Sequence, residues 1–327
     1  MKKVTIIIPN YNGEVFLPAC LDGLRAQEGA DFDTLVVENG SQDSSREVLA
    51  RYPEVRVLQM EENLGFAGGV NADIRAADTP YVLLLNNDTR PFPGFVRELL
   101  AAIEKSESIF SVSAQMLRMD RPDLLDDAGD GYCALGWAFQ HGTARPAEEY
   151  AAPRRVFSAC AGAAIYRRDL LEKTGLFDEA HFAYLEDIDL GFRGRLLGCQ
   201  NLYAPRAKVL HVGSGTSGSK YNSFKVRLAA RNSVYVAHKN LAPWQKVLNA
   251  PALALGHLVK LVFFARRGFA KDYFAGLKEG ILTCGTLKTV DFADVPFARQ
   301  LSLEAWLLGD TVRYAVQVFV RKLNPKM

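Results

Sequence analysis

The amino-terminal part of the chain alternates short apolar runs with segments of helical periodicity, and this alternation restricts the chain to few folds. The apolar, β-branched runs predict buried strands over residues 4–8, 34–37, 55–58 and 81–85. The patterns between them predict helices near residues 15–25, 44–51 and 67–77. Strands separated by helices are joined by right-handed crossovers. The chain is therefore predicted to have an α/β fold with a mainly parallel sheet flanked by helices.

Polar loops follow three of the predicted strands. Their sequences are Pro9-Asn10-Tyr11-Asn12-Gly13, Glu38-Asn39-Gly40-Ser41-Gln42-Asp43 and Asn86-Asn87-Asp88-Thr89. The carboxyl ends of parallel strands meet at one edge of a sheet, where open α/β proteins bind ligands. Asp88 is therefore expected beside a nucleotide phosphate and its metal ion. An Asx turn ahead of Pro91 and Pro93 explains the third loop without a ligand, so both interpretations are open at this point.

A second acidic segment lies around residue 187. Apolar positions at three- and four-residue spacing predict a helix with one buried face, at Leu185, Ile188, Phe192 and Leu196. Glu186, Asp187 and Asp189 fall in its first turn, where they either stabilise the positive end of the helix dipole or form a site. Successive helical residues turn by about 100°, so Asp187 and Asp189 diverge by roughly 200°. We expect one of the two to be catalytic and the other structural.

Composition indicates a globular protein. With 327 residues and 49% hydrophobic content, the chain can bury the core of two domains or of one large domain. Its five cysteines form no Cys-x-x-Cys pair and no zinc-type spacing with histidines, which favours a reduced, cytosolic setting. The strand-like start at Val4 is too short and too β-branched for a signal peptide. No nucleic-acid-binding motif is recognisable, so nucleic acid is not expected as a partner.

Regular patterning is lost and then returns in the middle of the chain. From residue 118 to 153 there is little periodicity, which predicts an excursion over the site or a flexible lid. Strands are predicted over residues 156–166 and 201–211. The Gly- and Ser-rich stretch 213–218 is expected to become ordered only when a ligand binds.

The last part of the chain is helical in pattern, which predicts a catalytic domain over residues 1–240 and a helical region over 241–327. The net charge is +2, but residues 251–327 carry 11 basic and 6 acidic side chains, an excess that suits anionic phospholipid surfaces or a solvated helix. Residues 247–265 are apolar, but four residues interrupt them: Asn249, Pro251, His257 and Lys260. An interfacial amphipathic helix fits this pattern better than a membrane span. A subdomain packed on the sheet, or on a second copy in a homodimer, fits it equally well.

Five motifs occur along the chain in a fixed order: Ile7-Ile8-Pro9-Asn10-Tyr11-Asn12, Val36-Val37-Glu38-Asn39-Gly40-Ser41-Gln42-Asp43, Asn63-Leu64-Gly65-Phe66-Ala67-Gly68-Gly69-Val70-Asn71, Leu84-Leu85-Asn86-Asn87-Asp88, and Phe177-Asp178-Glu179 leading to Glu186-Asp187. Together they resemble the motifs of the family 2 glycosyltransferases, inverting enzymes that move a sugar from a nucleotide diphosphate. The bacterial rhamnosyltransferase-like branch is especially similar. The resemblance covers residues 4–240 approximately. It implies the GT-A nucleotide-diphospho-sugar transferase fold, with a Rossmann-like sheet and a C-terminal helical extension.

The resemblance assigns a donor nucleotide site. It implies contacts from Pro9, Asn10, Tyr11, Asn12, Glu38, Asn39, Gly68, Asn71, Asn87 and Asp88. Glu38 stands where the family usually has Asp, and it would accept the N3 hydrogen of uracil or thymine. Gly68 would permit close approach of the nucleotide at a helix start. Asn71 either reaches the nucleotide or supports packing.

The resemblance also implies a metal and a base. Asp88 corresponds to the last acid of the family's Asp-x-Asp-like element, with Asn86 in place of the first acid, and would bind Mg²⁺ or Mn²⁺ on the diphosphate. His211 corresponds to a histidine that contacts metal or diphosphate in relatives, although a structural role is equally open. Asp187 corresponds to the catalytic base. Glu186 would hold the acceptor or orient the loop.

Three further positions match the family less specifically. Asp189 is assigned to the helix cap. Ala161 and Gly162 correspond to a small-residue stretch beside the donor sugar, or serve close strand packing. Arg231-Asn232 corresponds to a pair that the family keeps, where the basic side chain meets phosphate or lies on a solvated face.

The expected function is transfer of rhamnose or another hexose from a dTDP- or UDP-sugar to a hydroxyl of a surface-glycan or lipid-linked oligosaccharide acceptor. Such chemistry belongs to polysaccharide biosynthesis for the cell envelope, in the cytoplasm or at the inner face of the plasma membrane. A catalytically silent, membrane-docked scaffold is an alternative, but it gives no reason for Asp88 and Asp187 to occur together. A sugar nucleotidyltransferase is a second alternative, but the amino terminus lacks its Gly-rich, basic triphosphate loop.

Overall fold

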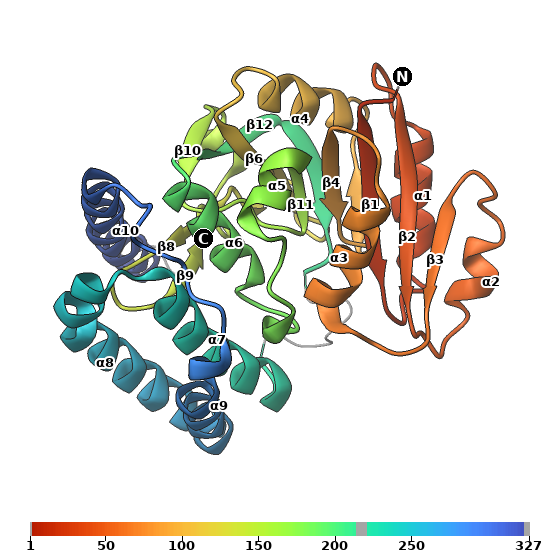
Figure 1. Cartoon of the computed structure of the whole chain (residues 1–327). Helices are drawn as coiled ribbons and strands as arrows, with labels where there is room; N and C mark the ends of the chain where they lie inside the picture. Colours follow the sequence, from red (N-terminus) through yellow and green to blue (C-terminus); the bar gives the residue numbers. More distant parts are fainter. Residues whose placement is uncertain (1, 214–220, 324–327) are drawn as a thin grey trace.

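The computed structural model describes residues 2–213 and 221–323 and contains one large central sheet (Figure 1). Its spatial order is β10-β12-β6-β11-β4-β1-β2-β3, with β5 paired to β12 and β7 paired to β6. The strands of this sheet are β1 (Val4–Asn10), β2 (Phe32–Asn39), β3 (Arg56–Met60), β4 (Tyr81–Leu85), β5 (Thr89–Pro91), β6 (Ile109–Arg118), β7 (Leu125–Asp127), β10 (Arg154–Val156), β11 (Ala163–Arg167) and β12 (Gln200–His211). A separate two-stranded sheet is formed by β8 (Asp130–Tyr132) and β9 (Ala138–Gln140).

Most long strands of the central sheet run in the same direction. β1 is parallel to β2 and β4, β2 is parallel to β3, and β6 is parallel to β12. β11 lies between β4 and β6 and is antiparallel to both. The predicted α/β fold is therefore confirmed, with β11 as the long strand that runs the other way. The carboxyl ends of its parallel neighbours and the amino end of β11 share one edge of the sheet.

Helices cover both faces of the sheet. They are α1 (Leu17–Arg25), α2 (Ser45–Leu49), α3 (Gly65–Ala76), α4 (Phe95–Ile103), α5 (Arg168–Thr174) and α6 (Glu186–Leu196). Successive strand residues point to opposite faces, so Ile6 packs in the cluster that contains Leu21 of α1 and Leu99 of α4. Ile7 packs in the cluster that contains Val70 of α3. Both faces are apolar because helices bury both, which explains the near-continuous apolar strands.

The segment without periodicity is folded. Residues 118–153 include β7, β8, β9 and the 3₁₀ helix η1 (Ala147–Tyr150). Tyr132 is 1% exposed and Phe139 is 8% exposed. The prediction of a flexible lid is wrong, because these aromatic side chains anchor the segment in apolar clusters. The strand predicted over residues 156–166 is in fact two strands, β10 and β11.

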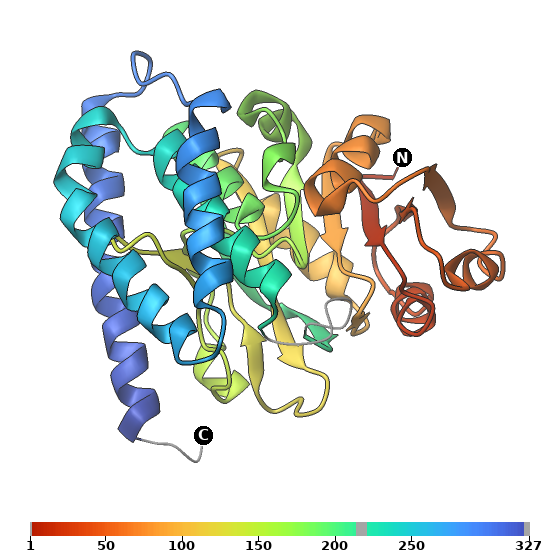
Figure 2. The same ribbon diagram turned by 90° about the horizontal axis from the view of Figure 1, so that it is seen from below.

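The C-terminal helices pack against the sheet region. They are α7 (Ser223–Asn240), α8 (Pro243–Ala265), α9 (Ala270–Thr283) and α10 (Phe297–Leu323), and the 3₁₀ helices η2 (Glu179–His181) and η3 (Cys284–Thr286) lie before α6 and after α9. α8 and α10 lie at the periphery of the molecule (Figure 2). Phe192 of α6, Val236 of α7 and Leu307 of α10 share one apolar cluster. The predicted boundary at residue 240 coincides with the end of α7 and stays a prediction.

Candidate functional site

The predicted site residues lie at the edge where the parallel strands end. The strand ends at this edge are Asn10 of β1, Asn39 of β2, Leu85 of β4 and His211 of β12. Because β11 runs in the opposite direction, Ala161 and Gly162 enter this row just before β11 begins. Asn86 N donates a hydrogen bond to Gly162 O at 2.9 Å, which joins the loop after β4 to the start of β11.

The first two polar loops and Asn87 form one hydrogen-bonded network. Asn10 Nδ2 donates to Glu38 Oε2 at 2.7 Å, and Asn87 Nδ2 donates to Asn10 Oδ1 at 2.7 Å. Ser41 N donates to Glu38 Oε1 at 2.8 Å. Asn12, which has a left-handed φ of 51°, donates from its backbone N to Ser41 Oγ at 2.9 Å. The three loops are therefore held in fixed positions relative to one another.

Glu38 supports this network from inside. It is 0% exposed, and each of its carboxylate oxygens accepts a hydrogen bond from the protein. Both oxygens of this carboxylate are thus used within the protein, and its contact with the N3 hydrogen of a base stays a prediction. Pro9, Tyr11 and Asn12 keep exposed surface at the same edge and are the accessible positions of the first loop.

Asn39, Gly68 and Asn71 are also buried. Asn39 Nδ2 donates to Gly65 O at 2.9 Å, which fixes the start of α3. Asn71 Nδ2 donates to Phe177 O at 2.8 Å, and Asn71 Oδ1 accepts from Phe177 N at 3.1 Å. Gly68 lies inside α3. The hydrogen bonds of Asn71 support its packing alternative, whereas the nucleotide contacts of Asn39 and Gly68 stay predictions.

His211 lies between two carboxylates. Its Nε2 is 3.2 Å from Asp88 Oδ1, and its Nδ1 is 2.7 Å from Asp126 Oδ2. Burial alone would lower the pKa of His211, but the hydrogen bonds to Asp126 and Asp88 outweigh it and raise the pKa to about 10. Val212 N donates to Asp88 O at 3.0 Å, so the end of β12 and the loop after β4 are joined directly.

Asp88 and His211 fit a divalent cation. Carboxylate oxygen and imidazole nitrogen are ligands that Mn²⁺ accepts, and the cation would displace the proton that His211 Nε2 otherwise directs to Asp88. Two ligand atoms each about 2.1 Å from one ion are about 3 Å apart at a right angle, close to the observed 3.2 Å. A metal-binding histidine commonly donates its second ring N–H to a carboxylate, as His211 does to Asp126. The stretch 213–218, predicted to respond to a ligand, lies outside the described residues apart from Gly213.

Asp187 is half-buried in the first turn of α6. Its Oδ2 accepts a hydrogen bond from Ala161 N at 3.3 Å, and its Oδ1 accepts from Ile188 N at 2.8 Å. Burial raises the pKa of Asp187, and the backbone hydrogen bonds oppose the rise. A raised pKa makes the carboxylate a stronger proton acceptor. Glu186 is buried, and burial together with the charge of Asp187 raises its pKa well above the ordinary value.

The loop that carries Asp88 and the helix that carries Asp187 contact the same backbone segment. Asp187 binds Ala161 N, and Gly162 O accepts from Asn86, two residues before Asp88. A Cβ on Gly162 would lie 3.1 Å from Asn86 Nδ2, so the close approach requires a small residue. The segment therefore joins the element that carries Asp88 to the element that carries Asp187.

Asp189 is separate from this site, as the angular argument predicted. It is 0% exposed and forms ion pairs with Arg193 at 2.7 Å and with Lys239 at 2.9 Å. Asn240 Nδ2 donates to it at 2.8 Å. Burial acts to raise the pKa of Asp189, but Arg193 and Lys239 lower it below its ordinary value. Asp189 therefore connects α6 to α7. The predicted role of Asp189 as the cap of α6 is wrong.

A strained turn precedes α6. Three non-glycine residues have φ between 61° and 69°: Phe182, Tyr184 and Leu185. Such values cost energy and persist where surrounding contacts fix them. Asn232 of α7, which is 0% exposed, provides those contacts. Its Nδ2 donates toward three carbonyl oxygens, those of His181 (2.9 Å), Ala183 (2.9 Å) and Tyr184 (2.7 Å).

Arg231 supports the same turn. Its Nη2 donates to Ala180 O at 2.9 Å and to His181 O at 3.0 Å, and its Nη1 pairs with Glu279 of α9 at 3.2 Å. The predicted alternatives for the Arg231-Asn232 pair, a phosphate contact or a solvated face, are both replaced by a positioning role. The pair fixes the turn that carries Glu186 and Asp187.

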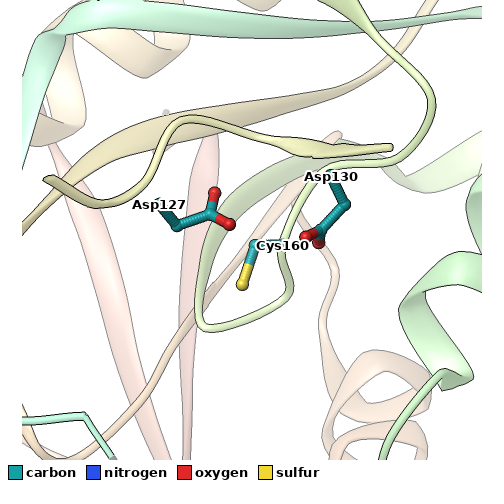
Figure 3. A group of neighbouring side chains, drawn as sticks. All are labelled: Asp127, Asp130 and Cys160. Atoms are coloured by element: carbon teal, nitrogen blue, oxygen red, sulfur yellow. The ribbon is translucent and has the colours of Figure 1, made fainter. Parts of the chain in front are cut away.

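Three further side chains, Asp127, Asp130 and Cys160, converge on one another (Figure 3). The charge of Asp187 acts on all three. One ligand atom from each lies within 4.8 Å of the others. Asp127 is 0% exposed and Asp130 is 6% exposed. Asp127 Oδ1 accepts from Gly129 N at 2.5 Å, but Asp127 Oδ2 has no hydrogen-bond partner within the described part of the chain.

Charge compensation distinguishes this group from Asp189. No described Lys, Arg or His side chain forms an ion pair with Asp127 or Asp130. Burial raises the pKa of Asp127 to about 7 and that of Asp130 well above its ordinary value, and the neighbouring carboxylates, including Asp187, add to both rises. Two buried carboxylates in this arrangement favour a bound proton.

Sequence analysis missed Asp126, Asp127 and Asp130. They fall in the segment whose lack of periodicity predicts an excursion over the site or a lid. The available signal was carboxylate density, because the run Asp126-Asp127-Ala128-Gly129-Asp130 is as rich in acids as the start of α6.

Comparison with known proteins gives consistent matches. Residues 5–175 match the family model described as Glycosyl transferase family 2. The chain is 25% identical over 271 residues to the N-acetylglucosaminyl-diphospho-decaprenol L-rhamnosyltransferase of Mycobacterium tuberculosis, covering 74% of this chain and 87% of that protein.

Solved structures share the fold at lower identity. The mannosyltransferase PcManGT from Pyrobaculum calidifontis, in complex with GDP-Man and Mn²⁺, superposes with a TM-score of 0.55 at 16% identity, covering 95% of this chain and 86% of that chain. GalNAc-T7 with UDP, GalNAc and Mn²⁺ gives a TM-score of 0.58 at 14% identity, covering 72% and 48%. TarS 1-349 of S. aureus with UDP-GlcNAc gives 0.53 at 17% identity, covering 78% and 71%. At these identities the likeness is one of fold.

Replacement of Asn232 by alanine is expected to loosen the turn before α6. The variant leaves buried carbonyl groups without a donor, which lowers the free energy of unfolding by roughly 2–3 kcal/mol. Hydrogen exchange of the backbone amides of residues 183–189 should accelerate in the variant. Ser233→Ala is the matched control, because Ser233 is buried on the same helix and its Oγ donates only to Ala230 O. Equal exchange rates in the two variants would contradict the positioning role.

Replacement of Asp127 by asparagine is expected to change how stability depends on pH. The folded pKa of Asp127 is about 7, above the ordinary value of 3.8, so the folded state keeps a proton that the unfolded chain releases. Wild-type stability should therefore fall as pH rises from about 4 to about 7. Asp127→Asn should gain roughly 1–3 kcal/mol relative to wild type between pH 5 and pH 8, measured by urea unfolding.

The control for this measurement is Asp294→Asn, which makes the same chemical change at an exposed position. Its stability relative to wild type should not vary between the two pH values. A fall in the relative stability of Asp127→Asn at pH 8 would show that the wild-type carboxylate is ionised and bound to a cation instead.

Proposed function

The chain belongs to glycosyltransferase family 2, and on this basis we propose that it transfers rhamnose or another hexose from a dTDP- or UDP-sugar to a hydroxyl of a lipid-linked or surface-glycan acceptor. It is a transferase with the GT-A fold. The observation that carries the proposal is that the Ala161-Gly162 segment contacts both Asp187 and the loop that carries Asp88, which pairs with His211. One of these acids is suited to a metal and the other to a proton.

Direct displacement with inversion accounts for the arrangement. Asp187 takes the proton of the acceptor hydroxyl while that oxygen bonds to the anomeric carbon, and the bond from that carbon to the diphosphate oxygen breaks. The nucleoside diphosphate leaves with the electron pair. Asp88 and His211 would hold Mg²⁺ or Mn²⁺, which supplies positive charge to the leaving diphosphate. Glu186, buried beside Asp187, keeps the base in position.

The donor loops have distinct roles in this proposal. Tyr11 and Asn12 are the accessible residues of the first loop and would meet the nucleoside. Asn10, Glu38 and Asn87 hold that loop in place through their mutual hydrogen bonds. GalNAc-T7 with UDP and Mn²⁺ and PcManGT with GDP-Man and Mn²⁺ share this fold, which supports a cation and a nucleotide-sugar donor here.

The nature of the acceptor is supported by the mycobacterial relative, whose name describes L-rhamnose transfer to a diphospho-decaprenol-linked sugar. A lipid-linked acceptor lies at a membrane surface, and α8 has the properties that such a surface requires. By length and composition α8 could cross a membrane, and 11% of its most apolar window is buried. Its exposed apolar side chains fall on one face: Val247, Leu248, Leu255, Leu258, Val259 and Val262. The exposed Arg266 and Arg267 follow at its end.

We therefore propose that α8 lies along an anionic membrane, with its apolar face in the interface and its basic end at the headgroups. This arrangement would place the protein at the inner face of the plasma membrane.

Asp88→Ala and Asp187→Asn are expected to separate binding from transfer. In Asp88→Ala, Mn²⁺ should no longer strengthen the binding of UDP or dTDP, because a metal ligand is gone. The affinity in the presence of Mn²⁺, measured by calorimetry, should therefore be about tenfold or more below that of wild type. Asp187→Asn should bind the nucleotide with an affinity within about twofold of wild type. Its rate of nucleotide release from a panel of UDP- and dTDP-sugars should fall roughly 10²–10⁴-fold, because only the base is removed.

Asp31→Asn is the control, since Asp31 is exposed and precedes the amino end of β2, opposite the carboxyl ends of the parallel strands. It should match wild type in both measurements. Undiminished turnover of Asp187→Asn would exclude the role of base. An unchanged effect of Mn²⁺ on Asp88→Ala would exclude the role of Asp88 at the metal.

Leu255→Glu/Leu258→Glu is expected to reduce co-sedimentation with phosphatidylglycerol vesicles, because it charges the exposed face of α8 where these residues are 55% and 57% exposed. Wild-type binding should weaken as salt rises, since part of the attraction is electrostatic. Val57→Glu, on β3 and 45% exposed, is the control for the same change elsewhere. Loss of self-association in sedimentation velocity, with vesicle binding unchanged, would assign the face to a homodimer instead.

A further inference from the structure

A cavity lined by arginines lies at the other end of α6 from Asp187. Its volume is about 480 Å³, within the range of roughly 300–1,000 Å³ found for small-molecule sites. Three elements contribute one arginine each: Arg155 of β10, Arg195 of α6 and Arg299 of α10. Arg195 follows Asp187 by eight residues, so the cavity is about 12 Å along the helix from the base.

The positive charge of the three arginines is not neutralised by acidic residues in the described lining of the cavity. None of its described lining residues is acidic. Among the ion pairs formed by described side chains, none involves Arg155, Arg195 or Arg299. The neutral polar groups in the lining include Gln200 and Ser302.

Each of the two partly buried arginines is held in place by a backbone carbonyl. Arg195 Nη1 donates to Val156 O at 3.0 Å, and Arg299 Nη1 donates to Leu196 O at 2.9 Å. These contacts use a small part of the five N–H donors that each guanidinium carries. Arg155 is exposed and forms no side-chain hydrogen bond with described residues. The arginines are therefore positioned, and most of their donors remain for a ligand.

Arg195 has a hydrogen-bond donor and a positive charge that no described side chain pairs with directly. Its guanidinium stacks on Trp306 at 3.7 Å, and its Nε is buried without a hydrogen-bond partner in the described structure. Burial lowers the pKa of Arg195 to about 10, with Arg155 acting in the same direction and Asp310 opposing. Asp310 is itself occupied, because it pairs with Arg313 at 2.7 Å and accepts from Tyr132 N at 3.1 Å.

The start of α10 adds to the positive potential. α10 begins at Phe297, and Pro296, Ala298 and Arg299 line the cavity. The amino terminus of a long helix carries the positive end of the helix dipole and unpaired N–H groups. Arginine forks and helix amino termini are both matched to the oxygens of phosphate groups.

We propose that this cavity binds a phosphate or diphosphate group, separately from the donor site, through Arg155, Arg195 and Arg299. The cavity has room for the phosphate and for part of the molecule that carries it. The ligand is either a soluble phosphorylated molecule or the headgroup of a phospholipid. The inference holds whether or not the chain transfers a sugar, since it uses none of the residues at the Asp88 and Asp187 site.

Calorimetric titration of the full chain with pyrophosphate, in EDTA and at low salt, tests the proposal. One site per chain is expected. Arg155→Gln/Arg299→Gln should weaken it about tenfold or more, because charge-assisted hydrogen bonds are lost. Arg155→Gln alone is the second variant, since an exposed side chain is removed without disturbing the fold. Arg46→Gln/Arg51→Gln is the charge-matched control, because both residues are exposed, and its affinity should equal that of wild type.

The site and the source of the phosphate are separated by two further measurements. Asp88→Ala should bind pyrophosphate as wild type does, which distinguishes this cavity from the donor site. If phosphatidylglycerol vesicles bind wild type and lose affinity for Arg155→Gln/Arg299→Gln while pyrophosphate does not bind, the phosphate is that of a lipid headgroup. Equal affinity of wild type and Arg155→Gln/Arg299→Gln for both pyrophosphate and vesicles would overturn the proposal.

Discussion

The direction of one strand determines where the site forms. β11 is antiparallel to β4 and β6, so its amino end enters the row of carboxyl ends instead of lying at the opposite edge. Ala161 and Gly162 therefore stand between the loop that carries Asp88 and the helix that carries Asp187. The contacts on both sides are made by backbone atoms, Ala161 N with Asp187 and Gly162 O with Asn86. Backbone contacts of this kind depend on the topology and on small residues rather than on particular side chains.

The carboxylates at this edge differ in how their charge is compensated, and the difference separates their roles. Asp189 has Arg193 and Lys239 beside it, stays ionised and joins two helices. Asp88 faces His211, whose ring is oriented by Asp126. Asp127 has no cationic partner among the described residues, and burial favours its protonated form. Asp187 lies between these extremes: it is half-buried, fixed by backbone N–H groups and close to other acids, which is the environment of a base rather than of a structural ion pair.

The sequence predicted the features that have a local signal. Apolar runs predicted β1 to β4, helical spacing predicted α6, and the polar loops predicted the edge at which the ligand residues gather. Divergence of Asp187 and Asp189 followed from helix geometry alone. What the sequence did not predict depends on contacts distant in the chain. Glu38 and Asn71 form hydrogen bonds with residues far away in sequence, Asn10 and Phe177, and no local pattern indicates these contacts. Asp126 and Asp127 lie on the short strand β7, in a segment whose aromatic anchors, such as Tyr132 of β8, have no regular spacing in the sequence.

Helix α7 connects the site to the helices that follow residue 240. Asn232, Lys239 and Asn240 lie on one side of this helix and hold the turn and α6, through Asn232 on the carbonyls before Glu186 and through Lys239 and Asn240 on Asp189. The other side of α7 packs against α9, where a Cβ on Gly276 would lie 2.2 Å from Arg227 O. A helix packed this closely on one side and hydrogen-bonded on the other cannot shift without moving the turn. The helices after residue 240 therefore stabilise the position of Asp187, even though no residue of α8, α9 or α10 contacts it among the described interactions.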